Sequence, residues 1–227
     1  MLAQGGFGVK RGLKGMAVAD QVVLHGYRYS VYTWIARMVL VEKGVDCARV
    51  EVDPFAGAVA LHPFGRVPVL VHGGFSIYET AAIGRYVDLG FDGPELTPKG
   101  ARAQARMAQV VGIADSYAYW PMVRQVFAQR VFRPLTGEAV DAAQIAAGLR
   151  ASVRVLAALE ALAVEGEVLA GGLTLADCHL APMLGYFAMA PEGQAALAQY
   201  PALRARWEWV AQRPGYKATL PPLPGAG

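Results

Sequence analysis

Residues 63–70 have the sequence Pro63-Phe64-Gly65-Arg66-Val67-Pro68-Val69-Leu70, and they constrain the architecture of this chain more than any other segment. An apolar run typical of a strand begins at Val67, yet Pro68 lacks the N–H group that a strand uses for hydrogen bonding. Proline also makes a cis peptide bond accessible, at about 0.5–1 kcal/mol against about 2.5–4 kcal/mol before other residues. A cis Val67–Pro68 bond would turn the Val67 N–H and carbonyl away from the sheet, where they could pair with an extended peptide.

A second informative run follows a few residues later, Tyr78-Glu79-Thr80-Ala81-Ala82-Ile83. Its Glu79-Thr80 step is expected to begin a helix, and the first N–H groups of a helix have no partner within that helix. Those groups and the positive end of the helix dipole favour a bound carboxylate. A backbone clamp at Val67 beside an anion site predicts a receptor for a small acidic peptide.

The composition fits a folded protein with one large domain or two small ones. The chain has 227 residues, of which 55% are hydrophobic and 17% charged, and this balance excludes an intrinsically disordered chain. The net charge is +3, from 21 basic and 18 acidic residues scattered along the sequence. Such a small, scattered excess argues against a nucleic-acid partner.

Cysteine usage and hydropathy indicate a cytoplasmic protein with no metal centre. Cys47 and Cys178 lie far apart, without the spacing of metal ligands or of a disulfide framework, so a reducing cytoplasm is the simplest setting. No apolar run approaches the roughly 20 residues that span a bilayer, so we expect no membrane contact. Residues 1–20 are glycine-rich and basic, and we expect a poorly ordered extension there. A targeting peptide, or a true start at Met16, is the alternative.

The first part of the chain predicts elements in the order βαβ followed by ββα. Apolar residues at helical spacing favour a helix over residues 31–43, ended by Gly44. Short alternating or apolar runs favour strands around it. The expected strands are 22–26, 48–52, 68–71 and 75–78, and a second helix is expected at 80–89.

The second part of the chain predicts helices only. Residues 91–98 contain a glycine and two prolines and are the expected interdomain linker. A long helix then begins at Lys99, and Pro121 is expected to break or bend it. Further helices are expected at 141–162, at 175–189, which is apolar enough to be buried, and at 201–212.

The run Thr174-Leu175-Ala176-Asp177 has the form of an N-terminal capping box. The Asp177 carboxylate can reach back to the N–H of Thr174, so we interpret it as a structural residue and not as a catalytic one.

Five short motifs occur in a characteristic order: Leu24-His25-Gly26 leading to Ser30, Glu42-Lys43-Gly44-Val45, residues 63–68, Glu79-Thr80 with Ala82-Ile83, and Thr174-Leu175-Ala176-Asp177. Together they resemble the cytosolic glutathione transferase family, in its serine-type, bacterial-like form. The resemblance covers roughly residues 22–216.

That resemblance implies an α/β thioredoxin-like domain followed by an all-α helical domain, the glutathione transferase fold, in a homodimer. The implied organisation is an extension at 1–20, a thioredoxin-like glutathione-binding domain at 21–90, a linker at 91–98, an all-helical domain at 99–217 and a tail at 218–227.

By the same resemblance, the Ser30 hydroxyl meets the sulfur of glutathione. A thiol reacts as the thiolate, and its free pKa is about 8.5. A hydrogen bond from the hydroxyl and the N-terminus of the helix that begins at Val31 both favour the ionised form. Ser30 is also expected to be the N-cap of that helix, and the two roles are compatible. Tyr29 and Tyr32 are the alternatives, because other branches of the family use a tyrosine hydroxyl.

The resemblance also assigns the groups that hold the peptide. Val67, held by Pro68, would pair its backbone with the cysteinyl part of glutathione, and Glu79 and Thr80 would hold the γ-glutamyl end. The alternative for Glu79 is an ordinary acid in the first turn of a helix.

The segment between Asp53 and Pro63 is shorter than in many relatives, which carry a residue for the glycine carboxylate there. Arg66 or His62 is expected to substitute, although both fit equally well as surface residues.

The second substrate, a small apolar electrophile, is expected between the domains. Aromatic residues and methionine make an adaptable apolar wall, and several gather near Pro121. The expected wall residues are Tyr117, Trp120 and Met122, with Tyr119 and Val123 beside them, and a core position is the alternative for some.

The sequence thus predicts a glutathione transferase that uses glutathione as co-substrate and needs no metal. A glutathione-dependent isomerase or dehalogenase could use the same site. A binding module that keeps the fold without the activity is the alternative from a different class.

Overall fold

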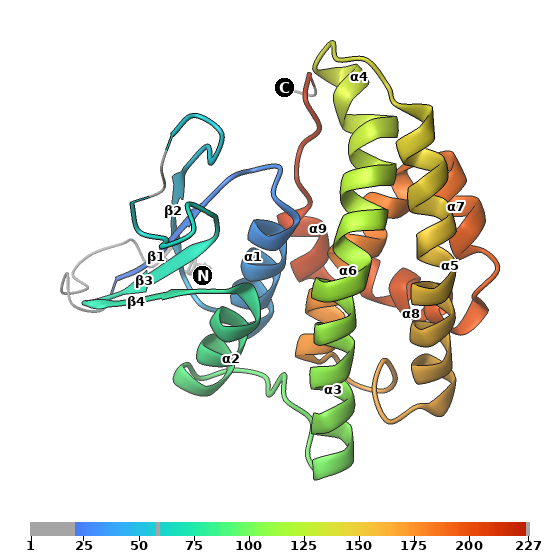
Figure 1. Ribbon diagram of the computed structural model, residues 1–227. Coiled ribbons are helices and arrows are strands. Elements are labelled where there is room, and N and C mark those ends of the chain that lie inside the picture. The colour runs from blue at the N-terminus through green and yellow to red at the C-terminus, as the bar shows by residue number, and fades with distance from the viewer. Residues whose placement is uncertain (1–20, 58–59, 226–227) are drawn as a thin grey trace, which may run out of the picture.

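The computed structural model describes residues 21–57 and 60–225 (Figure 1). The extension expected at residues 1–20 lies outside the described residues. In the amino-terminal part of the chain, four short strands pair into a mixed sheet with the order β2-β1-β3-β4. Its strands are β1 (Val22–Gly26), β2 (Ala48–Glu51), β3 (Val69–His72) and β4 (Phe75–Tyr78).

The pairing confirms the expected βαβ and ββα order. β1 pairs with β2 in parallel and with β3 in antiparallel orientation, and β3 forms a hairpin with β4. β3 begins at Val69 and not at Pro68, one residue later than expected. The reason is that Pro68 has no N–H group to donate to a neighbouring strand.

Two helices lie between the sheet and the helical part of the molecule, as Figure 1 shows. α1 (Val31–Lys43) is capped at its end by Gly44, whose φ of 77° suits glycine, and α2 (Thr80–Gly90) follows β4. Trp34 in α1 is fully buried and stacks near Tyr186 and Tyr216 of the helical part. The two parts therefore share one hydrophobic core.

A buried ion pair holds the connection between the two parts. The Lys43 ammonium lies 3.0 Å from the Asp88 carboxylate, and both side chains are almost completely buried. Asp88 also accepts hydrogen bonds from the Leu96 N–H and the Thr97 hydroxyl, while Lys43 donates to the Pro94 carbonyl. Residues 94–97 are thereby bound to the ends of α1 and α2.

The carboxyl-terminal part is helical. Its central helix is α6 (Leu175–Met189), which is buried over almost its whole length, as its apolar sequence predicts. The others are α3 (Ala101–Ile113), η2 (Ala114–Phe132), α4 (Arg133–Leu135), α5 (Ala142–Glu165), α7 (Pro191–Leu197), α8 (Pro201–Ala211) and α9 (Pro214–Thr219).

Pro121 was expected to break or bend the helix, and no break occurs there. The helix changes from α to π form at Ala114 and continues through Pro121 to Phe132. In an α-helix the proline ring would meet the carbonyl four residues earlier. The wider turn of a π-helix, which bonds to the fifth residue back, accommodates the ring without ending the helix.

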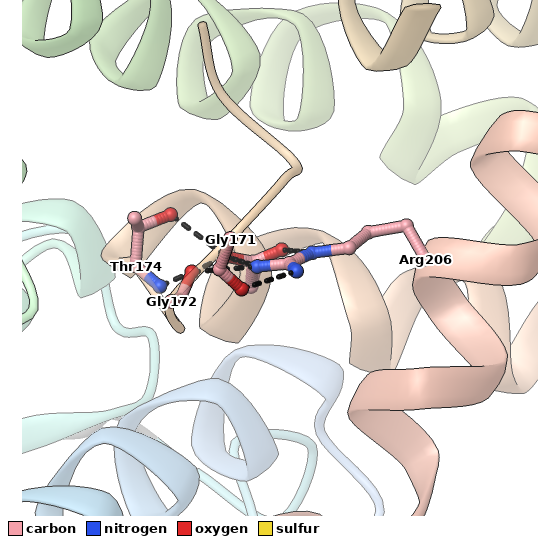
Figure 2. Close-up of polar contacts among 5 residues, drawn as sticks. Gly171, Gly172, Thr174 and Arg206 are labelled. Atoms are coloured by element: carbon pink, nitrogen blue, oxygen red, sulfur yellow. Dashed lines mark hydrogen bonds and ion pairs between the residues drawn. The ribbon is translucent and has the colours of Figure 1, made fainter. Parts of the chain in front are cut away.

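The expected capping box at the start of α6 is confirmed, and Arg206 completes it (Figure 2). The Asp177 carboxylate accepts from the Thr174 N–H at 2.8 Å. The Arg206 guanidinium donates to both oxygens of the same carboxylate, at 2.6 and 2.8 Å. Arg206 also donates to the carbonyls of Gly171 and Gly172, so α8 holds the loop that precedes α6. These contacts support the structural interpretation of Asp177.

The last helix extends beyond the domain end expected at residue 217. Thr219 lies in α9, is 2% exposed and accepts a hydrogen bond from the Trp34 indole at 3.1 Å. The irregular tail therefore begins at Leu220, two residues later than expected.

Candidate active site

The sheet register brings three separate segments to one end of the sheet. His25 lies opposite Val69, and Val69 lies opposite Tyr78. The chain that leaves β1, the chain that enters β3 and the chain that leaves β4 therefore meet at the same end. These segments carry the predicted residues Ser30, Val67, Pro68, Glu79 and Thr80.

Ser30 is the N-cap of α1, as expected. Its Oγ accepts a hydrogen bond from the Thr33 N–H at 3.3 Å, and its side chain is half-buried. In the described part of the chain the Ser30 hydroxyl donates no hydrogen bond. The serine proton is thus available to an acceptor placed at the helix N-terminus, while the oxygen stays held in place by the cap.

Tyr32 turns toward the helical part of the molecule. Its ring lies 5.0 Å from that of Tyr119 and 6.3 Å from that of His179. Burial, and next the negative charge of Asp115, raise the pKa of Tyr32 well above its usual range. Tyr32 is half-buried, and its ring packs against the helical part and not beside Ser30, which favours Ser30 over Tyr32.

Tyr29, the other alternative, immediately precedes Ser30 in the chain, whereas Tyr32 follows it. Its ring contacts Phe132 at the end of η2, with ring centres 5.2 Å apart, and its carbonyl accepts from the Tyr186 hydroxyl at 3.0 Å. The loop before α1 is therefore bound to the helical part through both a ring and a backbone group.

The Val67–Pro68 peptide bond is cis, as expected. Pro68 is buried and Val67 is half-buried, just before β3 begins. Among residues 21–57 and 60–225, no hydrogen bond involves the backbone N–H or carbonyl of Val67. Both groups are therefore available to an added peptide.

Glu79 has a backbone conformation that is rare for its residue type. It precedes α2 with a φ of 66°, one of two positive φ values among the described residues other than glycine. The expected alternative of a first-turn acid is wrong, because Glu79 is the N-cap residue and its carboxylate does not cap the helix. Residues in such strained conformations cluster at functional sites.

The N-terminus of α2 is open to an anion. No side chain caps it, and the first bond within the helix is donated by the Ile83 N–H to the Glu79 carbonyl. Thr80, the first helical residue, is buried at 7% exposure, whereas the Glu79 side chain is 67% exposed. The site combines an exposed carboxylate for an ammonium group with free N–H groups for a carboxylate.

His62 is not the surface residue that one expectation allowed. It is 5% exposed, its Nδ1 accepts from the Phe64 N–H at 3.1 Å, and its ring packs against Tyr78. Its Nε2 lies 4.0 Å from the Glu79 carboxylate. His62 therefore supports the Glu79 side of the site, and of the two residues expected at the glycine end only Arg66 is exposed.

The residues expected to form the apolar wall do not gather in one place. Tyr117 and Trp120 are 64% and 59% exposed, whereas Met122 is completely buried in the core. The aromatic pair beside Ser30 is Tyr29 with Phe132. Sequence reasoning missed Phe132, because only the packing of η2 against the loop before α1 shows that the two residues meet.

The described ranges offer neither a metal site nor a membrane-spanning helix. No group of three or more His, Cys, Asp or Glu side chains there could hold a metal ion. No helix within those ranges is both long and apolar enough to cross a membrane.

Comparisons with known proteins agree with this geometry. Residues 24–95 match the family model "Glutathione S-transferase, N-terminal domain", and residues 142–205 match the corresponding C-terminal domain. Glutathione S-transferase 3 of Zea mays is 34% identical over 82% of this chain and 87% of its own length. Glutathione S-transferase F10 of Arabidopsis thaliana is 32% identical, with 80% and 88% covered.

The structure of apo glutathione S-transferase III superimposes with a TM-score of 0.80 at 32% identity, covering 91% of this chain and all of that one. Both relatives are plant proteins, so they give no support to the expected serine-type, bacterial-like form of the family.

Proposed function

The chain belongs to the glutathione S-transferase family and is a glutathione transferase, and on that premise we propose that the end of its sheet near Ser30 holds glutathione for reaction. Glutathione is the co-substrate, and its sulfur attacks an electrophilic apolar molecule. The enzyme's task is to bind the peptide, favour the thiolate and orient the sulfur.

Ser30 is the residue that favours the thiolate. Its hydroxyl donates to the sulfur while its oxygen keeps the bond from Thr33, and the N-terminus of α1 adds a favourable dipole. A helix dipole stabilises an anion by about 0.3–1 kcal/mol, a hydrogen bond contributes about 1 kcal/mol, and 1.36 kcal/mol corresponds to one pKa unit. These two effects are large enough to bring a thiol with a free pKa of about 8.5 close to neutrality.

Val67, Glu79 and Thr80 bind the peptide. The free backbone groups of Val67 pair with the cysteinyl unit, as an added strand would. The Glu79 carboxylate takes the γ-glutamyl ammonium, and the N-terminus of α2 at Thr80 takes the carboxylate beside it. The positive φ of Glu79 carries this proposal, because residues in strained conformations cluster at functional sites.

Arg66 is the best-placed group for the glycine carboxylate, and Tyr29 with Phe132 forms the apolar wall for the electrophile. Arg66 is exposed in the segment before Val67, and the aromatic pair flanks Ser30 between the two parts of the molecule. This wall replaces the one expected from Tyr117, Trp120 and Met122.

Family membership also supports a homodimer in the cytoplasm. Light scattering on the purified protein tests the dimer, which should give about twice the chain mass of 24.2 kDa.

Two measurements test the site. The protein should be retained on immobilised glutathione and released by free glutathione. Ultraviolet titration of the bound thiol should show that Ser30→Ala raises the thiol pKa by at least about one unit, the effect of losing a hydrogen bond to an anion. The matched control is Ser76→Ala on β4, an exposed serine that should leave the curve unchanged. An unchanged Ser30→Ala curve would remove Ser30 from this role.

A further inference from the structure

A polar cluster that the proposed chemistry does not use joins three helices behind the site. It consists of Tyr32 in α1, Asp115 and Tyr119 in η2, and His179 in α6, and we call it the Asp115 cluster. The His179 Nε2 lies 2.7 Å from an Asp115 carboxylate oxygen. The rings of Tyr119 and His179 both pack against the ring of Tyr32.

The burial of His179 calls for an explanation. Its side chain is 3% exposed, in a helix whose other residues are almost all apolar core, and its partner Asp115 is 36% exposed. Burying an imidazole is unfavourable unless it is hydrogen-bonded, so a leucine would serve the core of α6 at least as well. The pair of His179 and Asp115 therefore indicates that these residues do something other than stabilise the fold.

The cluster contacts the helix turn that carries Ser30. Tyr32 lies two residues after Ser30, in the same turn in which the Thr33 N–H holds the serine oxygen. On the other side of Ser30, the Tyr186 hydroxyl of α6 binds the Tyr29 carbonyl. α6 and η2 thus hold the loop on both sides of the serine, and the Asp115 cluster is the second of these two attachments.

We propose that Asp115 and His179 are positioning residues of the transferase reaction, which act through Tyr32 to hold the first turn of α1 and its Ser30 hydroxyl in place. The inference rests on the proposed function of Ser30. The charged and titratable groups around Tyr32 are Asp115, Tyr119, His179 and Arg66, which lie on η2, on α6 and on the segment before β3. A small displacement of a reacting group lowers rates by ten- to a hundredfold, so a loosened turn should affect catalysis.

The test is a double-mutant cycle read by the titration of enzyme-bound glutathione. His179→Leu should raise the thiol pKa by about half a unit or more and lower kcat/KM at least about tenfold. His179→Gln keeps a donor for Asp115, so its thiol pKa and its kcat/KM should both lie close to the wild-type values. Combined with Ser30→Ala, His179→Leu should add nothing to the thiol pKa, because both act through one hydroxyl.

His72→Leu is the matched control. His72 is half-buried and, like His179, is bonded at 2.7 Å, in its case to the Tyr86 hydroxyl, but it lies at the opposite end of β3 from Val67. It should leave the thiol pKa unchanged. If His179→Leu folds poorly, Asp115→Asn tests the same contact at a more exposed position. It should also raise the thiol pKa.

An unshifted titration in both His179→Leu and Asp115→Asn, beside a shifted Ser30→Ala curve, overturns this inference alone. Additive shifts in the double variant also overturn it. An unshifted Ser30→Ala curve overturns the inference together with the proposed role of Ser30.

Discussion

At the scale of single residues, Glu79 shows how local strain and function are connected. A glutamate at a φ of 66° bears the steric penalty that a Cβ atom causes at positive φ, and glycine, which has no Cβ, avoids that penalty. The surrounding hairpin and α2 impose this conformation, and the side chain itself makes only the distant contact with His62.

Glu79→Gly should therefore have opposite effects on stability and binding. We expect it to raise the free energy of unfolding by roughly 1 kcal/mol, because glycine relieves the strain. We expect the KM for glutathione to rise about tenfold or more, since the carboxylate is lost. Urea unfolding and steady-state kinetics measure the two effects.

Glu79→Gln is the control for that variant. It keeps the strained backbone and loses only the charge, so the KM should rise without any gain in stability. Equal glutathione KM values in all three proteins would contradict the proposed role of Glu79.

Ser30 and His62 mark how far single residues can be predicted from sequence. Ser30 was predictable because an N-cap depends on its immediate neighbours along the chain, and the structure confirms the cap. His62 was not, because its burial comes from packing against Tyr78, on a strand that follows later in the sequence.

At the scale of elements, the Lys43–Asp88 pair binds the ends of α1 and α2 to the linker. Burial alone would raise the pKa of Asp88, but hydrogen bonds from Thr97, the Leu96 N–H and Lys43 outweigh it and hold that pKa below its ordinary value. A lowered folded-state pKa adds stability that is fully present above the unfolded-state pKa of about 3.9, and that is lost as the pH falls through the folded-state value.

Asp88→Asn should consequently destabilise the protein at neutral pH by about 3–5 kcal/mol, because it leaves a buried ammonium without its counter-ion. The difference from the wild type should begin to narrow below about pH 4, where the unfolded-state carboxyl takes up a proton, and close as the pH falls through the lowered folded-state pKa of Asp88. Urea unfolding over a pH series measures this difference, with the exposed Asp92→Asn as control. A constant difference down to pH 2 would show that the carboxylate charge is not the cause.

Most elements were predictable from apolar spacing and capping residues, which are local signals. The helices at 31–43 and 175–189 have the expected bounds because Ser30, Gly44 and Thr174 mark their ends. The course of η2 through Pro121 was not predictable, since a proline is expected to interrupt a helix and a π-helix that accommodates it is rare.

At the scale of the whole molecule, the electrophile site depends on two parts of the chain that meet only in the folded state. Tyr29 comes from the loop before α1 and Phe132 from the end of η2, about a hundred residues later in the sequence. No local pattern pairs them, and sequence reasoning favoured the more conspicuous aromatic cluster near Pro121.

Phe132→Ala should therefore raise the KM for an aromatic electrophile about tenfold and leave the KM for glutathione within about twofold, because it removes one side of the apolar wall. Trp120→Ala is the control, since Trp120 is 59% exposed and should change neither value. A raised electrophile KM in Trp120→Ala, with an unchanged one in Phe132→Ala, would contradict this and favour the wall residues that were expected from the sequence.

The most direct measurement of the central claim is a crystal structure of the protein with glutathione bound. We expect the sulfur within hydrogen-bonding distance of the Ser30 hydroxyl, the cysteinyl backbone paired with Val67, and the γ-glutamyl group between Glu79 and the N-terminus of α2. A sulfur bound to the hydroxyl of Tyr29 or Tyr32, or a peptide seated away from this end of the sheet, would contradict it.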